Sequence, residues 1–208
     1  MNIGIIGAGM IGATAAQLFA RAGHDAAIAN TRGPVSLADL VAQIGPRVRA
    51  TTVDEAASFG EVVLLAIPFG RYSTLPASRL AGKVVVDAMN YYPQRDGRLS
   101  LDGLTSSELV ARHLAGARLV KAFNTLYFEA LATGGNPSAP VDERLALFLA
   151  GDDADAKATV VRLIEEIGFA PVDTGTLREG GRRQEPGSPI YNTPLTGAAA
   201  RVALDASR

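Results

Sequence analysis

Short apolar runs alternate with longer amphipathic stretches along the whole chain. The runs that are typical of strands lie at residues 2–6, 25–29, 48–53, 62–67, 84–86, 119–123, 145–150 and 170–173. Several of them are apolar at every position, which is typical of strands covered on both faces, as in a parallel sheet. The pattern therefore predicts a mostly parallel sheet buried between two layers.

Helical periodicity separates several of these runs. The first helical stretch places Ile11, Ala15 and Leu18 on one apolar stripe, and Gly23 follows as a stop signal. Helices are expected at residues 10–22, around 36–44 and at 154–167, with a loop rich in Gly, Arg and Pro at 177–194 and a short terminal helix at 195–205.

This order of elements predicts an α/β fold, a Rossmann-type doubly wound, mostly parallel sheet with right-handed crossovers and a small C-terminal appendage. The length of 208 residues suits one such domain. We expect residues 1–176 to form the Rossmann domain. Residues 177–208 are expected to add a loop and a short helix to the same domain.

Composition limits the chemistry that the chain can carry. There are no cysteines and only two histidines, His24 and His113, so neither disulfides nor metal sites are expected. The net charge of −1 gives no sign of a nucleic-acid partner, and no apolar run reaches the length of a membrane span. Because the first strand begins at once, we expect no signal peptide and a cytoplasmic protein.

A glycine-rich loop joins the first predicted strand to the first predicted helix. Gly7 permits a tight turn, Gly9 lets a pyrophosphate approach the backbone, and Gly12 lets the helix pack closely on the strand. The helix N-terminus offers free amide donors for phosphate. A tight turn without a ligand is the alternative. We predict a dinucleotide site with the loop residues Gly7, Ala8, Gly9, Met10, Ile11 and Gly12.

The tip of the second predicted strand indicates which dinucleotide is bound. NAD-binding domains place an Asp or Glu there, whereas this tip contains Asn30, Thr31 and Arg32. Arg32 can pair with a 2′-phosphate and Thr31 can donate a hydroxyl, unless Arg32 is merely a solvated loop residue. A carboxylate would repel that phosphate. Residues 1–176 are therefore predicted to bind NADP(H) in preference to NAD(H).

Further candidate residues follow the next strands, because ligands bind beyond the carboxyl ends of such strands. Pro68 ends its strand sharply, and we expect it to direct Ile67 and Phe69 toward the cofactor. Asn90 and Asn124 can each donate and accept a hydrogen bond, which suits a carboxamide such as nicotinamide.

Aromatic side chains gather at the same strand ends. Core packing is the common role of any single aromatic residue, but their grouping predicts a wall for a flat second ring. Nothing in the sequence activates the two tyrosine hydroxyls in the middle of the group. The residues are Phe69, Tyr91, Tyr92, Phe123 and Tyr127.

No convincing protein acid is found. His24 is expected at the opposite, amino edge of the sheet, and His113 is expected as a solvated residue on an outer helix. Lys121 and Asn124 lie three residues apart on a strand and are expected on opposite faces. Hydride exchange between a nicotinamide and a flavin-like ring needs no protein acid, because the cofactors carry the chemistry and the protein aligns them.

Six segments along the chain, taken in order, match one known family. They are Ile-Ile-Gly-Ala-Gly-Met-Ile-Gly at 5–12, Asn-Thr-Arg at 30–32, Ala-Ile-Pro-Phe at 66–69, Lys-Ala-Phe-Asn-Thr at 121–125, Ala-Gly-Asp-Asp at 150–153 and Val-Asp-Thr-Gly at 172–175. With these motifs the chain resembles the NADPH-dependent coenzyme F420 reductases, which comprise the F420H2:NADP oxidoreductases and their bacterial relatives. The domain is also shared with metal reductases that pass hydride to a flavin.

The resemblance implies a role for each matching residue. The loop matching residues 8–11 would hold the pyrophosphate, and the pair matching Thr31 and Arg32 would hold the 2′-phosphate. The deazaflavin would lie against the nicotinamide. The strand ends that approach the nicotinamide match Ile67, Phe69, Asn90 and Asn124.

The chain also departs from the archaeal members of this family. Val35 and Ser36 stand where those proteins carry a further basic residue, and Asn124 stands where they carry a histidine. The tail at 178–187 resembles the bacterial branch.

The leading hypothesis is an oxidoreductase that passes hydride between NADP(H) and coenzyme F420 or a flavin, with no catalytic side chain. The alternatives are an NADPH-dependent flavin, metal or imine reductase, and an NADP(H)-binding sensor without turnover. A homodimer is a further hypothesis, since a partner could cover the open edge of the site.

Overall fold

The computed structural model describes residues 1–206, and its centre is one eight-stranded sheet with the order β3-β2-β1-β4-β5-β6-β7-β8. Every neighbouring pair is parallel except β6 and β7. This confirms the predicted doubly wound, mostly parallel sheet. The strands are β1 (Asn2–Ile6), β2 (Asp25–Ala29), β3 (Val48–Thr51), β4 (Val62–Leu65), β5 (Val84–Asp87), β6 (Arg118–Ala122), β7 (Ala146–Gly151) and β8 (Ala170–Asp173).

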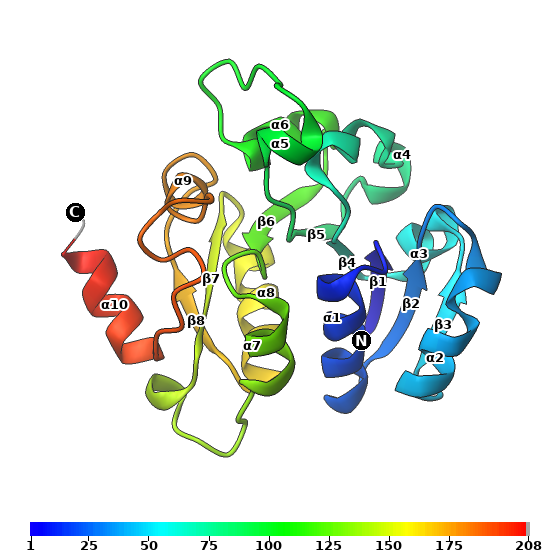
Figure 1. Cartoon of the computed structure of the whole chain (residues 1–208), viewed down its shortest axis with the longest axis horizontal. Helices are drawn as coiled ribbons and strands as arrows, with labels where there is room; N and C mark the ends of the chain where they lie inside the picture. Colours follow the sequence, from blue (N-terminus) through cyan, green and yellow to red (C-terminus); the bar gives the residue numbers. More distant parts are fainter. Residues whose placement is uncertain (207–208) are drawn as a thin grey trace.

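Helices pack on both faces of this sheet (Figure 1). Side chains from α1, α2, α7 and α8 form one buried cluster, and those from α3, α4 and α6 form another on the opposite face. The helices are α1 (Met10–Arg21), α2 (Ala38–Ile44), α3 (Val53–Phe59), α4 (Ala77–Leu80), α5 (Pro93–Asp96), α6 (Ser106–His113), α7 (Phe128–Thr133), α8 (Ala154–Glu166), α9 (Glu179–Arg183) and α10 (Gly197–Asp205), with 3-10 turns η1 (Pro34–Leu37), η2 (Phe69–Thr74) and η3 (Val141–Glu143).

Successive residues of one strand feed the two cores. Ile3 and Ile5 of β1 point into the first cluster, whereas Ile6 belongs to the second. This alternation explains why strands buried on both faces are apolar at most positions.

The C-terminal segment corrects one expectation. Residues 177–194 were predicted to be a loop, but they contain α9, and Gln184 just after this helix is fully buried. Ile190 then packs with Phe148 of β7 and with α10 in a third apolar cluster. The backbone N–H of Asn192 donates to the carbonyl of Thr125, 2.8 Å away. The segment therefore returns to the carboxyl end of β6 (Figure 1).

Two kinds of feature are absent from the described residues 1–206. No helix among them is both long and apolar enough to cross a membrane. Nor do His, Asp and Glu side chains gather there in a group that could hold a metal ion.

Candidate functional site

The glycine loop lies at the carboxyl end of β1, where the strand order changes direction between β2 and β4. Gly7 has φ 114°, and a Cβ there would lie 2.3 Å from the carbonyl oxygen of Ala66. A Cβ on Gly12 would lie 1.8 Å from the carbonyl oxygen of Gly7. A Cβ on Gly9 would meet no protein atom within 4 Å. Gly7 and Gly12 are therefore required by the fold, whereas nothing in the chain itself requires Gly9.

Helix α1 begins directly after this loop, at Met10, with Gly9 as its N-cap. No side chain caps its N-terminus, and its first turn contains no acidic residue. The first backbone amides and the positive end of the helix dipole are therefore available to an anion.

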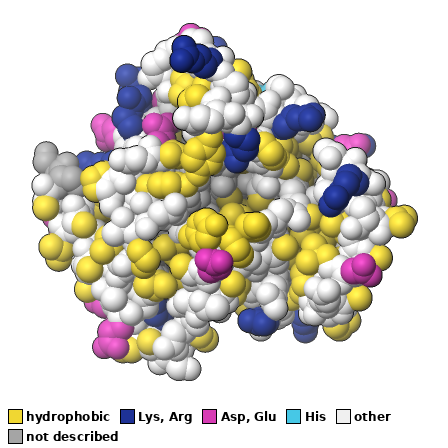
Figure 2. All heavy atoms as spheres, viewed as in Figure 1, with side chains coloured by type: hydrophobic (Ala, Val, Ile, Leu, Met, Phe, Trp, Pro, Cys, Tyr) yellow, Lys and Arg dark blue, Asp and Glu magenta, His cyan; other side chains and the backbone are white. Residues whose placement is uncertain are grey.

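Two cavities meet at the loop and share Gly9, Ala66, Ile67 and Pro68. The arginine cavity, of about 510 Å³, is lined by Ile6, Gly7, Ala8, Gly9, Asn30, Thr31, Arg32, Val53, Ala66, Ile67, Pro68, Arg71, Thr74 and Leu75. The tyrosine cavity, of about 340 Å³, is lined by Gly9, Met10, Ile11, Ala66, Ile67, Pro68, Ala88, Met89, Asn90, Tyr92, Arg95, Phe123, Asn124, Leu126, Tyr127, Phe128, Tyr191 and Asn192. Figure 2 shows hydrophobic side chains gathered around the hollowed middle of the face that it draws.

The arginine cavity contains the residues expected at the tip of β2, together with one that the sequence analysis missed. Arg32 and Arg71 both line it and are exposed. No carboxylate in the described part of the chain lies within ion-pair distance of either guanidinium. Asn30 acts locally, since its Oδ1 accepts from the backbone N–H of Arg32 at 2.9 Å and its Nδ2 donates to Ser36 Oγ at 2.9 Å. The cavity therefore carries two cations and no anion.

The tyrosine cavity brings Asn90 and Asn124 together, although they follow different strands. Asn90 Nδ2 donates to the backbone carbonyl of Asn124 at 2.9 Å, and Asn124 Nδ2 donates to Asn90 Oδ1 at 3.1 Å. Asn124 Nδ2 also donates to the backbone carbonyl of Gln184 at 2.9 Å. Asn124 is 4% exposed and its Oδ1 has no partner. A buried acceptor without a donor is costly, so a hydrogen bond from a bound molecule would stabilise it.

Two further residues of this cavity, Arg95 and Tyr191, were not predicted. Tyr191, from the segment after α9, forms a hydroxyl–hydroxyl hydrogen bond with Tyr92. Burial, followed by the neighbouring Tyr92, raises the pKa of Tyr191 above its ordinary value. Arg95 lies with its guanidinium carbon 4.9 Å from the centre of the Tyr92 ring and donates to the carbonyl of Asn90 at 2.7 Å.

Phe69 does not occupy the place that was predicted for it. Its ring is fully buried, 5.1 Å from the ring of Tyr72 and 5.4 Å from that of Tyr91. The chain turns into η2 directly after Pro68, and this turn directs Phe69 into the core. Tyr91 packs on Phe69 and does not line the tyrosine cavity either, so the aromatic wall there is made by Tyr92, Phe123, Tyr127, Phe128 and Tyr191.

Both histidines are structural. His24 is buried and its Nε2 lies 2.9 Å from Glu166. His113 was expected to be solvated, but it is half-buried: its Nε2 lies 3.1 Å from the carbonyl oxygen of Leu75, and its ring packs edge-on to Tyr72. Neither histidine lines the two cavities.

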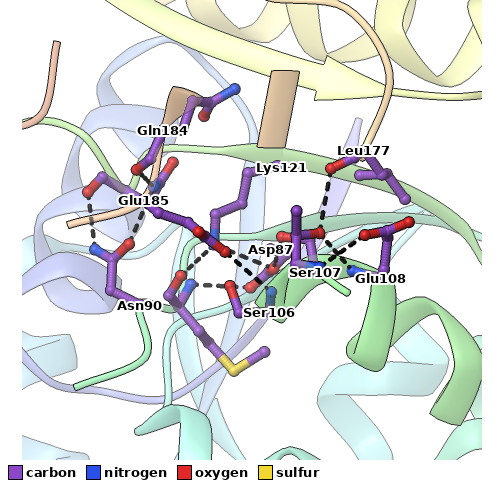
Figure 3. A network of polar contacts seen from close by, with 12 residues as sticks. Asp87, Asn90, Ser106, Ser107, Glu108, Lys121, Leu177, Gln184 and Glu185 are labelled. Atoms are coloured by element: carbon purple, nitrogen blue, oxygen red, sulfur yellow. Dashed lines mark hydrogen bonds and ion pairs between the residues drawn. The ribbon is translucent and has the colours of Figure 1, made fainter. Parts of the chain in front are cut away.

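A buried charge network supports the floor of the tyrosine cavity (Figure 3). Lys121 and Asp87 are 1% and 0% exposed and lie 3.2 Å apart. Lys121 also donates to the carbonyl of Met89, and Ser107 Oγ donates to Asp87 at 2.6 Å. The backbone N–H of Met89 donates to the other Asp87 oxygen at 3.0 Å. Lys121 thus pairs with Asp87 and not with Asn124, and the network fixes the chain just before Asn90.

The sheet topology, the glycine loop at the change of strand order and the uncapped helix α1 together define a dinucleotide-binding protein of the Rossmann type. The sequence model of the family described as NADP oxidoreductase, coenzyme F420-dependent, matches residues 2–91. A proposed F420-dependent NADP reductase from Arthrobacter sp. FB24 has the same fold, with a TM-score of 0.71 and 27% identity over 85% of this chain and 86% of that one. Residues 2–91 thus match this family of NADP-dependent oxidoreductases, and the fold shared with the Arthrobacter protein covers most of both chains.

Two further relatives extend the comparison. The hypothetical protein SMa0349 of Sinorhizobium meliloti has a TM-score of 0.83 and 38% identity, covering 94% of this chain and 95% of that one. Metalloreductase STEAP3 of Rattus norvegicus is 31% identical over 178 residues, which are 85% of this chain. The match covers 34% of the length of that curated relative, so the chain spans about a third of it.

Proposed function

We propose that the chain transfers hydride between NADP(H) and a flat ring acceptor of the deazaflavin (coenzyme F420) or flavin type. It holds the two rings side by side without a protein acid or base. The observation that carries this proposal is the open backbone at Gly9, where a cavity with two unpaired arginines meets a cavity with an unpaired buried amide oxygen.

Each part of NADP(H) has matching residues in this arrangement. The diphosphate suits the backbone of Gly7–Gly12 and the first amides of α1. The 2′-phosphate suits Thr31, Arg32 and Arg71, since one guanidinium group can donate two parallel hydrogen bonds to a phosphate. The nicotinamide carboxamide suits Asn124, because its NH₂ can donate to the Oδ1 that has no partner.

When bound, the dihydronicotinamide supplies a hydride, and this chemistry belongs to the cofactor. The chain itself positions the two rings and shields them from water. Ile67, Pro68 and Phe123 form apolar walls that exclude water from the space beside the loop. Tyr127 also lines this cavity and is 56% exposed, so an incoming flat substrate can reach its ring.

The match with STEAP3, a protein named as a metalloreductase, favours a flavin as the second candidate acceptor. In stopped-flow experiments with purified protein and NADPH, oxidised F420 and FMN would be offered separately. Enzyme-dependent loss of F420 absorbance supports the deazaflavin, and turnover with FMN alone selects the flavin. Tight NADPH binding without turnover of either acceptor would refute hydride transfer and favour a binding protein.

The NADP preference has its own test in Arg32→Ala. Loss of a charge-assisted contact costs about 1.5–3 kcal/mol, so the dissociation constant for NADPH should rise roughly 10- to 100-fold in calorimetric titrations. Binding of NADH, which lacks the 2′-phosphate, should hardly change. Arg71→Ala should weaken NADPH binding in the same direction, and Arg79→Ala on α4, outside the cavity, is the control. Equal losses for NADPH and NADH would contradict the assignment.

A further inference from the structure

The tyrosine cavity contains a polar feature that the binding of NADP(H) does not use, the hydroxyl pair of Tyr92 and Tyr191. We propose that this pair donates a hydrogen bond to the second substrate at the atom that gains negative charge when hydride arrives. This inference rests on the proposed function. It restricts the acceptor to rings with a nitrogen or carbonyl oxygen at that place.

The two tyrosines are brought together by tertiary structure. Tyr92 precedes α5, whereas Tyr191 lies 99 residues later, in the segment that returns after α9. That segment is fixed by the bond from the Asn192 N–H to the carbonyl of Thr125 and by the bond from the Tyr191 N–H to the carbonyl of Ser188, 3.1 Å long. The pair is therefore held in place before a substrate binds.

One hydroxyl proton of the Tyr92–Tyr191 pair has no acceptor within the described part of the chain. Two hydroxyls carry two protons, and the bond between them uses one. Asn90 Nδ2 is itself a donor to the Tyr191 oxygen, at 3.5 Å, and so cannot accept the second proton. The Asn192 side chain also bonds to the Tyr191 hydroxyl, and it acts as a donor because it lowers the pKa of that group. Among residues 1–206 no acceptor is found for the second proton. A tyrosine hydroxyl is protonated at neutral pH, and the raised pKa of Tyr191 acts in the same direction. One O–H donor is thus available to the cavity.

The chemistry needs such a donor and not an acid. As hydride moves, the C–H bond of the dihydronicotinamide breaks with both electrons, a bond to hydrogen forms on the acceptor, and the acceptor ring gains one negative charge. The tyrosines keep their protons, and water later supplies the proton that neutralises the reduced ring. A preorganised donor aimed at developing charge lowers the barrier, because it is in place before the reaction.

The test compares Tyr92→Phe, Tyr191→Phe and the double variant, with Tyr72→Phe as the control. Tyr72 packs on Phe69 and does not line the tyrosine cavity. Either single variant retains one hydroxyl that can still donate, so we expect each to slow single-turnover hydride transfer less than about threefold. The double variant removes the donor and should slow transfer by more than about tenfold, which exceeds the product of the single effects.

A binding measurement provides a readout besides turnover. In anaerobic fluorescence titrations without NADP(H), the double variant should lose affinity for the reduced, anionic acceptor about tenfold more than for the oxidised acceptor. Its dissociation constant for NADPH should match that of the wild type.

The outcomes separate the two proposals. If the wild type reduces neither F420 nor FMN, the proposed function fails, and this inference fails with it. If the wild type turns over but the double variant is as fast and discriminates the two acceptor forms equally well, the function stands and only the role of the tyrosine pair is refuted. If the double variant lost affinity for NADPH as strongly as for the reduced acceptor, the role of the tyrosine pair would also be refuted. The pair would then be structural.

Discussion

A methyl group at Gly9 tests the dinucleotide site with little disturbance of the fold. Gly9 has φ −78° and ψ −170°, an extended conformation that any residue adopts, and its added Cβ meets no atom within 4 Å. The cost is that alanine is a poorer N-cap than glycine, about 0.5 kcal/mol. In a domain of this size that cost lowers Tm by about 1–2 °C. Gly9→Ala should therefore fold almost as the wild type does.

Its effect on binding should be much larger. The methyl group projects into the space where a diphosphate must approach the backbone of the loop. We expect the dissociation constants for NADPH and NADH to rise together by at least about tenfold, which corresponds to 1.4 kcal/mol. Isothermal titration calorimetry measures the affinities, and scanning calorimetry measures Tm on the same samples.

Gly12→Ala provides the contrast, because its Cβ would lie 1.8 Å from the carbonyl oxygen of Gly7. That variant should lose stability itself, so its loss of binding carries no information about the ligand. Wild-type affinity in Gly9→Ala would refute the placement of the diphosphate at this loop. A large fall in the Tm of Gly9→Ala would instead refute the conclusion that the fold does not require glycine at this position.

Two further predictions concern charges. Lys121→Met leaves the fully buried Asp87 without its cation and should cost about 3–5 kcal/mol in urea unfolding, whereas a loss below about 1 kcal/mol would show that the pair is unimportant. The pKa of Asp153 is lowered, first by Arg118 and then by the N–H of Ala156. Its contribution to stability is therefore complete above the unfolded value near 3.8 and decreases as pH falls through that range toward the native pKa. Asp153→Asn should lower Tm at pH 7 and leave it closer to the wild type at pH 3; an unchanged difference would contradict this coupling.

The strands were predictable because burial on both faces removes polar residues from them. Several helices were not, for reasons of length: α4 and α5 contain four residues each, too few for a periodic stripe. Helices α3 and α6 carried a different signal, a Thr followed three residues later by Glu. Thr52 with Glu55, and Thr105 with Glu108, form complete capping boxes. That spacing therefore predicts the start of both helices.

The site was predictable where topology alone decides position. The carboxyl ends of parallel strands share one edge of the sheet, so the loop after β1, the tip of β2 and the residues after β4, β5 and β6 had to lie together. One residue beyond Pro68, topology alone no longer decides which side chain faces the site. Phe69 follows Pro68 directly, yet the turn into η2 buries it, whereas Arg71 in the same turn lines the cavity. The local geometry of a short turn decides which of these side chains faces the ligand, and no periodicity records it.

The side of the tyrosine cavity formed by Tyr191 and Asn192 depends on contacts between distant segments. Tyr191 and Gln184 reach the site only because residues 184–192 cross the carboxyl end of β6, where Asn124 donates to both Asn90 and the carbonyl of Gln184. Asn124 thus joins the loop after β5 to the C-terminal segment. Its remaining oxygen is the unpaired acceptor assigned to the nicotinamide. A cofactor amide bound there would therefore contact the same side chain that fixes the segment carrying Tyr191, so that the two substrates would share one support.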